Sequence, residues 1–148
     1  MFKVSINSSL LFFVLLIQSC SINDCDDPAD EFNTTPYMLE IPSSLPPIEV
    51  PIGNPLTQEG VSLGRKLFYE PLLSADGTQS CASCHIQSTG FSDPSQYSTG
   101  IDGVQGDRNA MALINLMWSP SLNWDGSSSE LEDQAFEPVT NPIEMHDT

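Results

Sequence analysis

The feature that most constrains this chain is the pentapeptide CASCH at residues 81–85. Two cysteines separated by two residues and followed by a histidine form the arrangement that attaches a c-type haem. The thiols of Cys81 and Cys84 add to the two vinyl groups, and the imidazole of His85 reaches the iron from one side. The spacing suits this chemistry because it lets both sulfurs reach adjacent pyrrole edges. The motif therefore predicts one covalent haem c bound by Cys81, Cys84 and His85.

Two other uses of these cysteines remain open. A zinc ion needs four ligands, but the spare candidates are Cys25 and His146, and neither lies at a second paired spacing. A redox-active or structural disulfide between Cys81 and Cys84 is the remaining alternative.

The first 19 residues have the features of a lipoprotein signal peptide. Lys3 precedes an apolar stretch at residues 10–17, which is too short to span a bilayer as a stable anchor. Ser19 stands directly before Cys20, so we expect cleavage there and lipidation of Cys20, with ordinary cleavage as the alternative. Cys25 is then a free thiol, or it pairs with Cys20 if no lipid is added. The expected location is the periplasm or cell envelope, with membrane attachment only through the N-terminal lipid.

Residues 20–52 are rich in proline and acidic side chains and show little apolar periodicity. Such a segment buries too little apolar surface to offset its ordering entropy. We expect a disordered tether here, followed by a domain at residues 53–148.

The net charge of the chain limits the classes of molecule that it can bind. It has four basic and 20 acidic residues, for a net charge of −16, and loss of Lys3 with the signal peptide makes it one unit more negative. Nucleic acid and an anionic membrane surface are therefore excluded as partners. Two explanations of the acidity remain: electrostatic attraction of a basic redox partner, or solubility of an exported protein.

Helix signals occur at three places in the domain. Thr57 can cap a first helix that Pro71 closes, and Asn109 can open a second, which Pro120 ends. Residues 72–108 between them are polar and are expected to form a loop around the haem attachment.

The third helix is expected from a capping box of Ser129 and Glu132, and it should end before Pro138. Since no alternating strand pattern of useful length occurs, the predicted class is all-α, a cytochrome c-like haem domain with long loops. An apolar core this thin is marginal by itself, and haem would supply the missing apolar bulk.

Five sequence motifs carry a resemblance to a known family. They are LGRKLFYEPLLS at 63–74, CASCH at 81–85, GDRNA at 106–110, NWDG at 123–126 and NPIEM at 141–145. In order and spacing they resemble the N-terminal haem domain of the bacterial di-haem cytochrome c peroxidases and the related methylamine-utilisation di-haem enzymes. The resemblance covers about residues 56 to 146.

The resemblance implies a function and several residue roles. In that family the N-terminal haem reduces hydrogen peroxide, with electrons from a small cytochrome c or cupredoxin that enter through a second haem. His85 matches the proximal ligand, and Trp124 matches the tryptophan between the two haems. Gln134 and Glu144 match the distal-pocket pair, and Asn109 matches a residue associated with calcium at the domain junction.

Each of these residues also has a structural interpretation. Glu144 stands at the third position after Asn141, as in a capped helix start, and capping and catalysis are compatible. Taken alone, Trp124 would be a core aromatic, Gln134 a solvated helix residue and Asn109 a helix cap.

The chain departs from the family pattern in one loop. Many members carry a histidine there that blocks the resting iron, but no histidine lies between His85 and Arg108. The resemblance therefore implies a peroxidatic haem that stays open without reductive activation. A sixth ligand could still come from one of four residues: Met111, Met117, Met145 or His146.

The resemblance also implies a longer protein. A second haem motif and its domain are expected after Thr148. In the full-length form, two copies of the protein are expected to form a homodimer.

Two other functions stay open. One is a single-haem electron carrier in which Met145 or Met117 binds the iron opposite His85. The other is oxidation of a protein or organic substrate, as in the methylamine-utilisation relatives.

Overall fold

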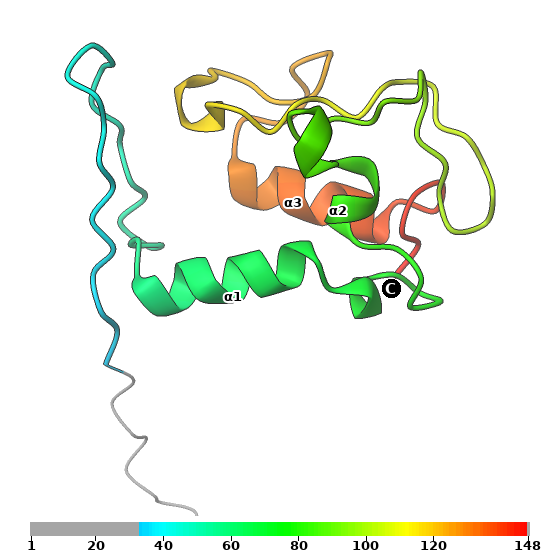
Figure 1. Cartoon of the computed structure of the whole chain (residues 1–148), viewed down its shortest axis with the longest axis horizontal. Coiled ribbons are helices and arrows are strands. Elements are labelled where there is room, and N and C mark those ends of the chain that lie inside the picture. The colour runs from blue at the N-terminus through cyan, green and yellow to red at the C-terminus, as the bar shows by residue number, and fades with distance from the viewer. Residues whose placement is uncertain (1–32, 148) are drawn as a thin grey trace, which may run out of the picture. The chain divides into compact units, whose positions relative to one another are not determined.

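The computed structural model describes residues 33–147 (Figure 1), and Thr34–Thr148 forms one compact unit. Its helices are α1 (Gln58–Phe68), α2 (Cys81–Cys84) and α3 (Leu131–Thr140), with 3₁₀ turns at Pro71–Leu73, Gln87–Thr89 and Leu116–Trp118. Within the described range, β structure is limited to isolated bridges. The helix-rich class with long loops therefore agrees with the prediction. No described helix is long and apolar enough to cross a membrane.

The expected signal peptide at residues 1–19, the lipidation site Cys20 and the thiol of Cys25 lie outside the described residues.

Helix α1 begins where the sequence predicts. The Thr57 hydroxyl accepts a hydrogen bond from the Gly60 N–H at 3.0 Å. Glu59 lies in the first turn, and Arg65 and Lys66 lie in the last, so both ends of the helix dipole are complemented. The helix ends at Phe68, and a 3₁₀ turn follows.

The predicted helix after Asn109 is wrong. Only the short turn Leu116–Trp118 forms there, and Asn115 before it has a left-handed φ of 56°. The backbone groups that a helix would need are used elsewhere. The Met111 carbonyl accepts a hydrogen bond from the His85 ring, and the Leu113 N–H donates to the Phe91 carbonyl.

Helix α3 forms, but both predicted boundaries are wrong. Glu130, not Ser129, occupies the N-cap position and makes no side-chain capping hydrogen bond, and the helix continues through Pro138 to Thr140. A proline inside a helix removes one N–H donor and normally ends the helix. Here the chain folds back on the helix end, and the Met145 N–H donates to the Pro138 carbonyl at 3.1 Å.

The compact unit begins earlier than the predicted boundary at Gly53. The segment 35–56, called the arm below, is fixed by Tyr37 N–H donating to the Leu56 carbonyl and by the Trp118 indole N–H donating to the Pro46 carbonyl, both at 3.0 Å. The first contact joins the two ends of the arm, and the second joins the arm to the turn at Leu116–Trp118.

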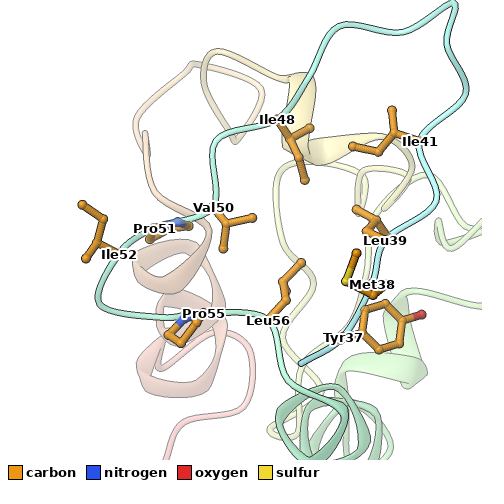
Figure 2. A pocket seen from close by; sticks show the side chains of 10 residues that line it. All are labelled: Tyr37, Met38, Leu39, Ile41, Ile48, Val50, Pro51, Ile52, Pro55 and Leu56. Carbon is orange, nitrogen blue, oxygen red and sulfur yellow. The ribbon is translucent and has the colours of Figure 1, made fainter. Parts of the chain in front are cut away.

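Apolar side chains line the inside of the arm (Figure 2). Residues from the two stretches 37–41 and 48–56 of the arm, such as Leu39 and Val50, border an open apolar pocket. Because all its lining residues precede residue 57, the pocket contains none of the five motifs.

The described part has a very small protein core. Leu122 and Met145 are its buried apolar residues, and its helices make few contacts with one another. A domain that packs so little apolar surface is marginal without a further apolar component.

We expect loss of the Thr57 cap to destabilise the domain. Thr57→Ala removes the acceptor for the Gly60 N–H and should lower the free energy of unfolding by about 1 kcal/mol. Urea denaturation of the haem-loaded protein measures this change. Ser62→Ala, on the exposed face of the same helix, is the matched control and should stay within about 0.5 kcal/mol of the parent. Equal losses in both variants would contradict the cap.

Candidate functional site

The short helix α2 places both cysteines and His85 on one turn of chain. The Ser80 N–H donates to the Ser83 hydroxyl at 3.1 Å, which begins the helix, and the His85 N–H donates to the Cys81 carbonyl at 2.9 Å, which ends it. Cys81 and Cys84 are free thiols of intermediate burial. Both sulfurs and the imidazole therefore lie within one local structure, as covalent haem attachment requires.

Two backbone carbonyls fix the His85 ring. Its Nδ1 lies 3.0 Å from the carbonyl oxygens of both Phe91 and Met111. Since both neighbours are acceptors, Nδ1 carries the proton and Nε2 keeps its lone pair. A metal-ligating histidine is typically oriented in this way by acceptors at its other ring nitrogen.

Phe91 reaches His85 through an unusual backbone conformation. Its φ is 58°, a left-handed value that is rare for a bulky residue, and Gly90 before it has φ 72°. The Phe91 N–H donates to the Ile86 carbonyl at 2.9 Å, and its ring packs edge-on against Phe68 with centroids 6.0 Å apart. Backbone strain of about 1–3 kcal/mol persists where the surroundings over-determine it. Here the strained residue supplies a carbonyl to the histidine.

Glu144 lies in the turn at residues 141–147, where Asn141 holds it. The Asn141 side-chain N–H donates to Glu144 Oε1 at 2.8 Å, and Asn141 Oδ1 accepts from the Ile143 N–H at 3.0 Å. The capping geometry is thus present, but it starts a turn and not a helix.

Glu144 also lies within electrostatic reach of the haem motif. Desolvation by neighbouring atoms raises the pKa of its carboxyl although part of the side chain is exposed, while the Asn141 hydrogen bond and His85 lower it. Burial is the main reason why the pKa of the Cys84 thiol is raised, and the charge of Glu144 raises it further. The turn therefore brings Glu144 near Cys84 and His85.

Gln134 is positioned by α3. Its Oε1 is the buried side-chain polar atom of the described residues that has no hydrogen-bond partner. Leaving such an atom unpaired costs about 1–3 kcal/mol, so it marks a place where a ligand or water can bind. The interpretation as a solvated helix residue is wrong for this oxygen.

Trp124 and Asn109 connect two of the motifs. The Trp124 indole N–H donates to the Asn109 carbonyl at 2.8 Å, while 65% of the residue is exposed. The core-aromatic interpretation is therefore wrong. The Asn109 side-chain N–H donates to the carbonyls of Asp93 at 3.0 Å and Ser95 at 2.6 Å, so Asn109 holds the loop after the haem motif and caps no helix.

An ion pair makes a second connection between the same motifs. Arg108 Nη1 lies 2.7 Å from Asp125 Oδ2, and both side chains are about half exposed. The guanidinium and the Ser127 hydrogen bonds lower the pKa of Asp125 to about 2.

Three contributors to the site escaped the sequence analysis. The carbonyls of Phe91 and Met111 carry no side-chain signal. Asp93 accepts hydrogen bonds from the Ser98 hydroxyl at 2.7 Å and the Ser95 N–H at 2.8 Å. Against partial desolvation, these bonds lower the pKa of its carboxyl, and His85 adds a smaller effect in the same direction. The Asp-Pro-Ser turn sequence at residues 93–95 is the one local signal that could have indicated it.

These observations fit haem c better than zinc. No group of three or more histidine, cysteine or acidic residues in the described range could hold a metal ion. Burial raises the pKa of both thiols. The small core, the oriented imidazole and the unpaired Gln134 oxygen all suit a large apolar group attached at Cys81 and Cys84.

Comparisons with known proteins agree with this geometry. The family model described as di-haem cytochrome c peroxidase matches residues 58–148. The methylamine utilization protein MauG of Methylorubrum extorquens is 44% identical over 96 residues, which cover 65% of this chain and 27% of that protein. The cytochrome c peroxidase Ccp of Escherichia coli K12 is 41% identical over 96 residues, covering 65% of this chain and 21% of the relative.

A solved structure is also similar. The crystal structure of a MauG-like protein associated with microbial copper homeostasis has a TM-score of 0.69 and 38% identity, covering 74% of this chain and 35% of that one. The chain thus spans about a quarter of the length of curated relatives that it matches.

We expect the Arg108–Asp125 pair to persist to low pH. Since the pKa of Asp125 is depressed to about 2 from its usual 3.8, the pair is complete above pH 3.8 and is lost as pH falls through 2. Carboxyl NMR titration should give this low value in the parent and a higher value in Arg108→Gln, which stays below 3.8 because the Ser127 hydrogen bonds remain. Lys66→Gln is the control and should leave the titration unchanged. A parent value near 3.8 would contradict the pair in solution.

Proposed function

This chain belongs to the di-haem cytochrome c peroxidase family, and on that premise we propose that residues 53–148 form an N-terminal haem domain that reduces hydrogen peroxide to water. The observation that carries the proposal is the His85 ring, whose Nδ1 is held by the Phe91 and Met111 carbonyls so that Nε2 is free to bind iron. The electrostatic influence of His85 on the Glu144 carboxyl supports a place for Glu144 beside the haem motif.

Haem binding is assigned to the CASCH motif. Cys81 and Cys84 would hold the haem through thioether bonds, and His85 would bind its iron. Bound haem c would supply the redox iron at which peroxide is cleaved. Gln134 and Glu144 are the polar residues proposed to face bound peroxide, which the unpaired Gln134 oxygen and the raised pKa of Glu144 support.

Glu144 is proposed as the group that moves a proton. Its carboxylate takes a proton from the near peroxide oxygen and gives it to the far one as the O–O bond breaks, and Gln134 orients the substrate. The overall reaction joins one hydrogen peroxide with two electrons and two protons and yields two waters. The raised pKa of Glu144 suits this role because an efficient proton carrier needs a pKa closer to the working pH.

The electrons are proposed to come from a small cytochrome c or a cupredoxin, through a second haem in a further domain. Trp124 is the proposed route between the haems, and its exposure supports this because a neighbouring domain could contact the indole directly. The acidity of the chain would attract a basic donor.

Calcium and cellular location complete the proposal. With its amide nitrogen committed to the Asp93 and Ser95 carbonyls, Asn109 presents its side-chain oxygen as a calcium ligand at the domain junction. We propose a periplasmic or envelope protein, lipidated at Cys20 and homodimeric in its full-length form.

A single-haem electron carrier is the second candidate. Met145 is only 4% exposed and directly follows Glu144, so a methionine thioether lies in the region proposed for the distal side. Oxidation of a protein or organic substrate is a third, because relatives include methylamine utilization proteins.

The resting ferric spectrum separates peroxidase from carrier. We expect a high-spin spectrum that changes when peroxide is added, because no histidine lies between His85 and Arg108 to block the iron. Met145→Ala and Met117→Ala should leave the spectrum unchanged. A low-spin spectrum with a sulfur-to-iron band that either variant abolishes would establish the carrier and sink the peroxidase.

Glu144→Gln tests the proposed proton carrier. It should keep haem content and slow the reaction of the haem with peroxide by about 10²-fold or more, as measured by stopped-flow absorbance. In the parent the rate should rise as pH increases through the raised pKa, because only the ionised carboxylate accepts the proton.

The control variant is Glu130→Gln, an exposed carboxyl at the start of α3, which should react like the parent. An unchanged rate and pH profile in Glu144→Gln would remove Glu144 from the chemistry.

A further inference from the structure

We propose that the loop segment Gly100–Asp102 is a positioning element for Glu144. This inference rests on the proposed function, in which the Glu144 carboxylate moves a proton. The segment touches the Glu144 turn at its backbone on one side and at His146 on the other, and neither contact was expected from the sequence.

Gly100 approaches the turn too closely for any side chain. A Cβ built at Gly100 would overlap the Ile143 carbonyl oxygen and lie 2.8 Å from the Glu144 carbonyl oxygen. Gly100 lacks the positive φ of the nearby Gly103. The glycine is therefore required by close backbone approach and not by a special conformation.

The next residue binds the turn directly. The Ile101 N–H donates to the Glu144 carbonyl at 3.0 Å. The loop is itself fixed, because the Gly100 N–H donates to the Val104 carbonyl at 2.9 Å and the Gln79 side chain donates to the Thr99 carbonyl at 2.6 Å. A fixed loop can set the position of the Glu144 backbone.

Asp102 contacts the same turn at His146, two residues after Glu144. Its Oδ2 lies 3.0 Å from His146 Nδ1, with both side chains about half exposed. The Ala75 N–H donates to the Met145 carbonyl at 3.0 Å, which ties the same stretch to the loop before the haem motif. Figure 1 shows the red C-terminal segment next to the yellow-green loop that contains these residues.

Position matters here because proton transfer depends on geometry. A displacement of about 1 Å in a catalytic group can cost about 10²-fold in rate. Adding a methyl group at Gly100 must push the Ile143–Glu144 peptide away, and this moves the carboxylate that Asn141 orients.

The experiment uses the haem-loaded full chain with Gly100→Ala. Gly106→Ala is the matched control, since a Cβ there meets the Ser98 carbonyl oxygen at an ordinary 3.7 Å. We expect Gly100→Ala to keep its haem content and high-spin spectrum and to react with peroxide about 10- to 100-fold more slowly. Gly106→Ala should react like the parent.

A double-mutant cycle with Glu144→Gln separates positioning from general damage. If Gly100 acts through Glu144, Gly100→Ala should cause no further loss in the Glu144→Gln background. A full additional loss there, or a parent-like rate in the single variant, overturns the inference. If Glu144→Gln itself has the parent rate, the proposed function fails first, and the cycle shows which of the two has failed.

Asp102→Ala applies the same cycle without adding bulk to the backbone contact. It should slow the reaction by about two- to fivefold, the range for an exposed pair, and again only when Glu144 is present. If Gly100→Ala does not fold or load haem, the rate of Asp102→Ala tests the positioning role instead. A parent-like rate in Asp102→Ala would then overturn the positioning role.

Discussion

The two hydrogen bonds from His85 Nδ1 to the Phe91 and Met111 carbonyls are the constraint on which the rest of the site depends. They fix the ring and the tautomer together, so that only Nε2 can bind a metal. Phe91 supplies its carbonyl from a left-handed backbone conformation. The chain around Met111 supplies the other carbonyl and does not form the helix that its sequence favours. The backbone conformation of these two segments is therefore explained by their contacts with His85 and not by their local sequence.

The same constraint explains why the protein core is small. The segments that hold His85 are loops, and loops contribute polar backbone and few packed side chains. Leu122 and Met145 are the buried apolar residues of the described part, and the helices make few mutual contacts. A large apolar group attached at Cys81 and Cys84 would supply the apolar bulk that this small core lacks.

Features set by neighbouring residues could be predicted from the sequence. The CASCH motif and the Thr57 cap are of this kind, since each depends on spacing within one turn of chain. The missing helix after Asn109 and the C-terminal end of α3 depend on distant partners. Asn109 opens no helix because its side chain binds the loop at residues 93–95, and α3 continues through Pro138 because residues 145–147 return to its end. The close approach of Gly100 to residue 143 has no local sequence signal at all.

Glu144 shows how a structural and a chemical role can share one residue. The Asn141 amide that makes the turn look like a helix cap also fixes one carboxylate oxygen, and that bond lowers the pKa of the carboxyl. Desolvation near the haem motif raises the pKa, and it is the larger effect. A carboxyl held only by Asn141 would stay ionised and inert, whereas an unheld one would have no fixed direction. The opposition of the two effects combines the fixed orientation and the raised pKa that the proposed proton carrier needs.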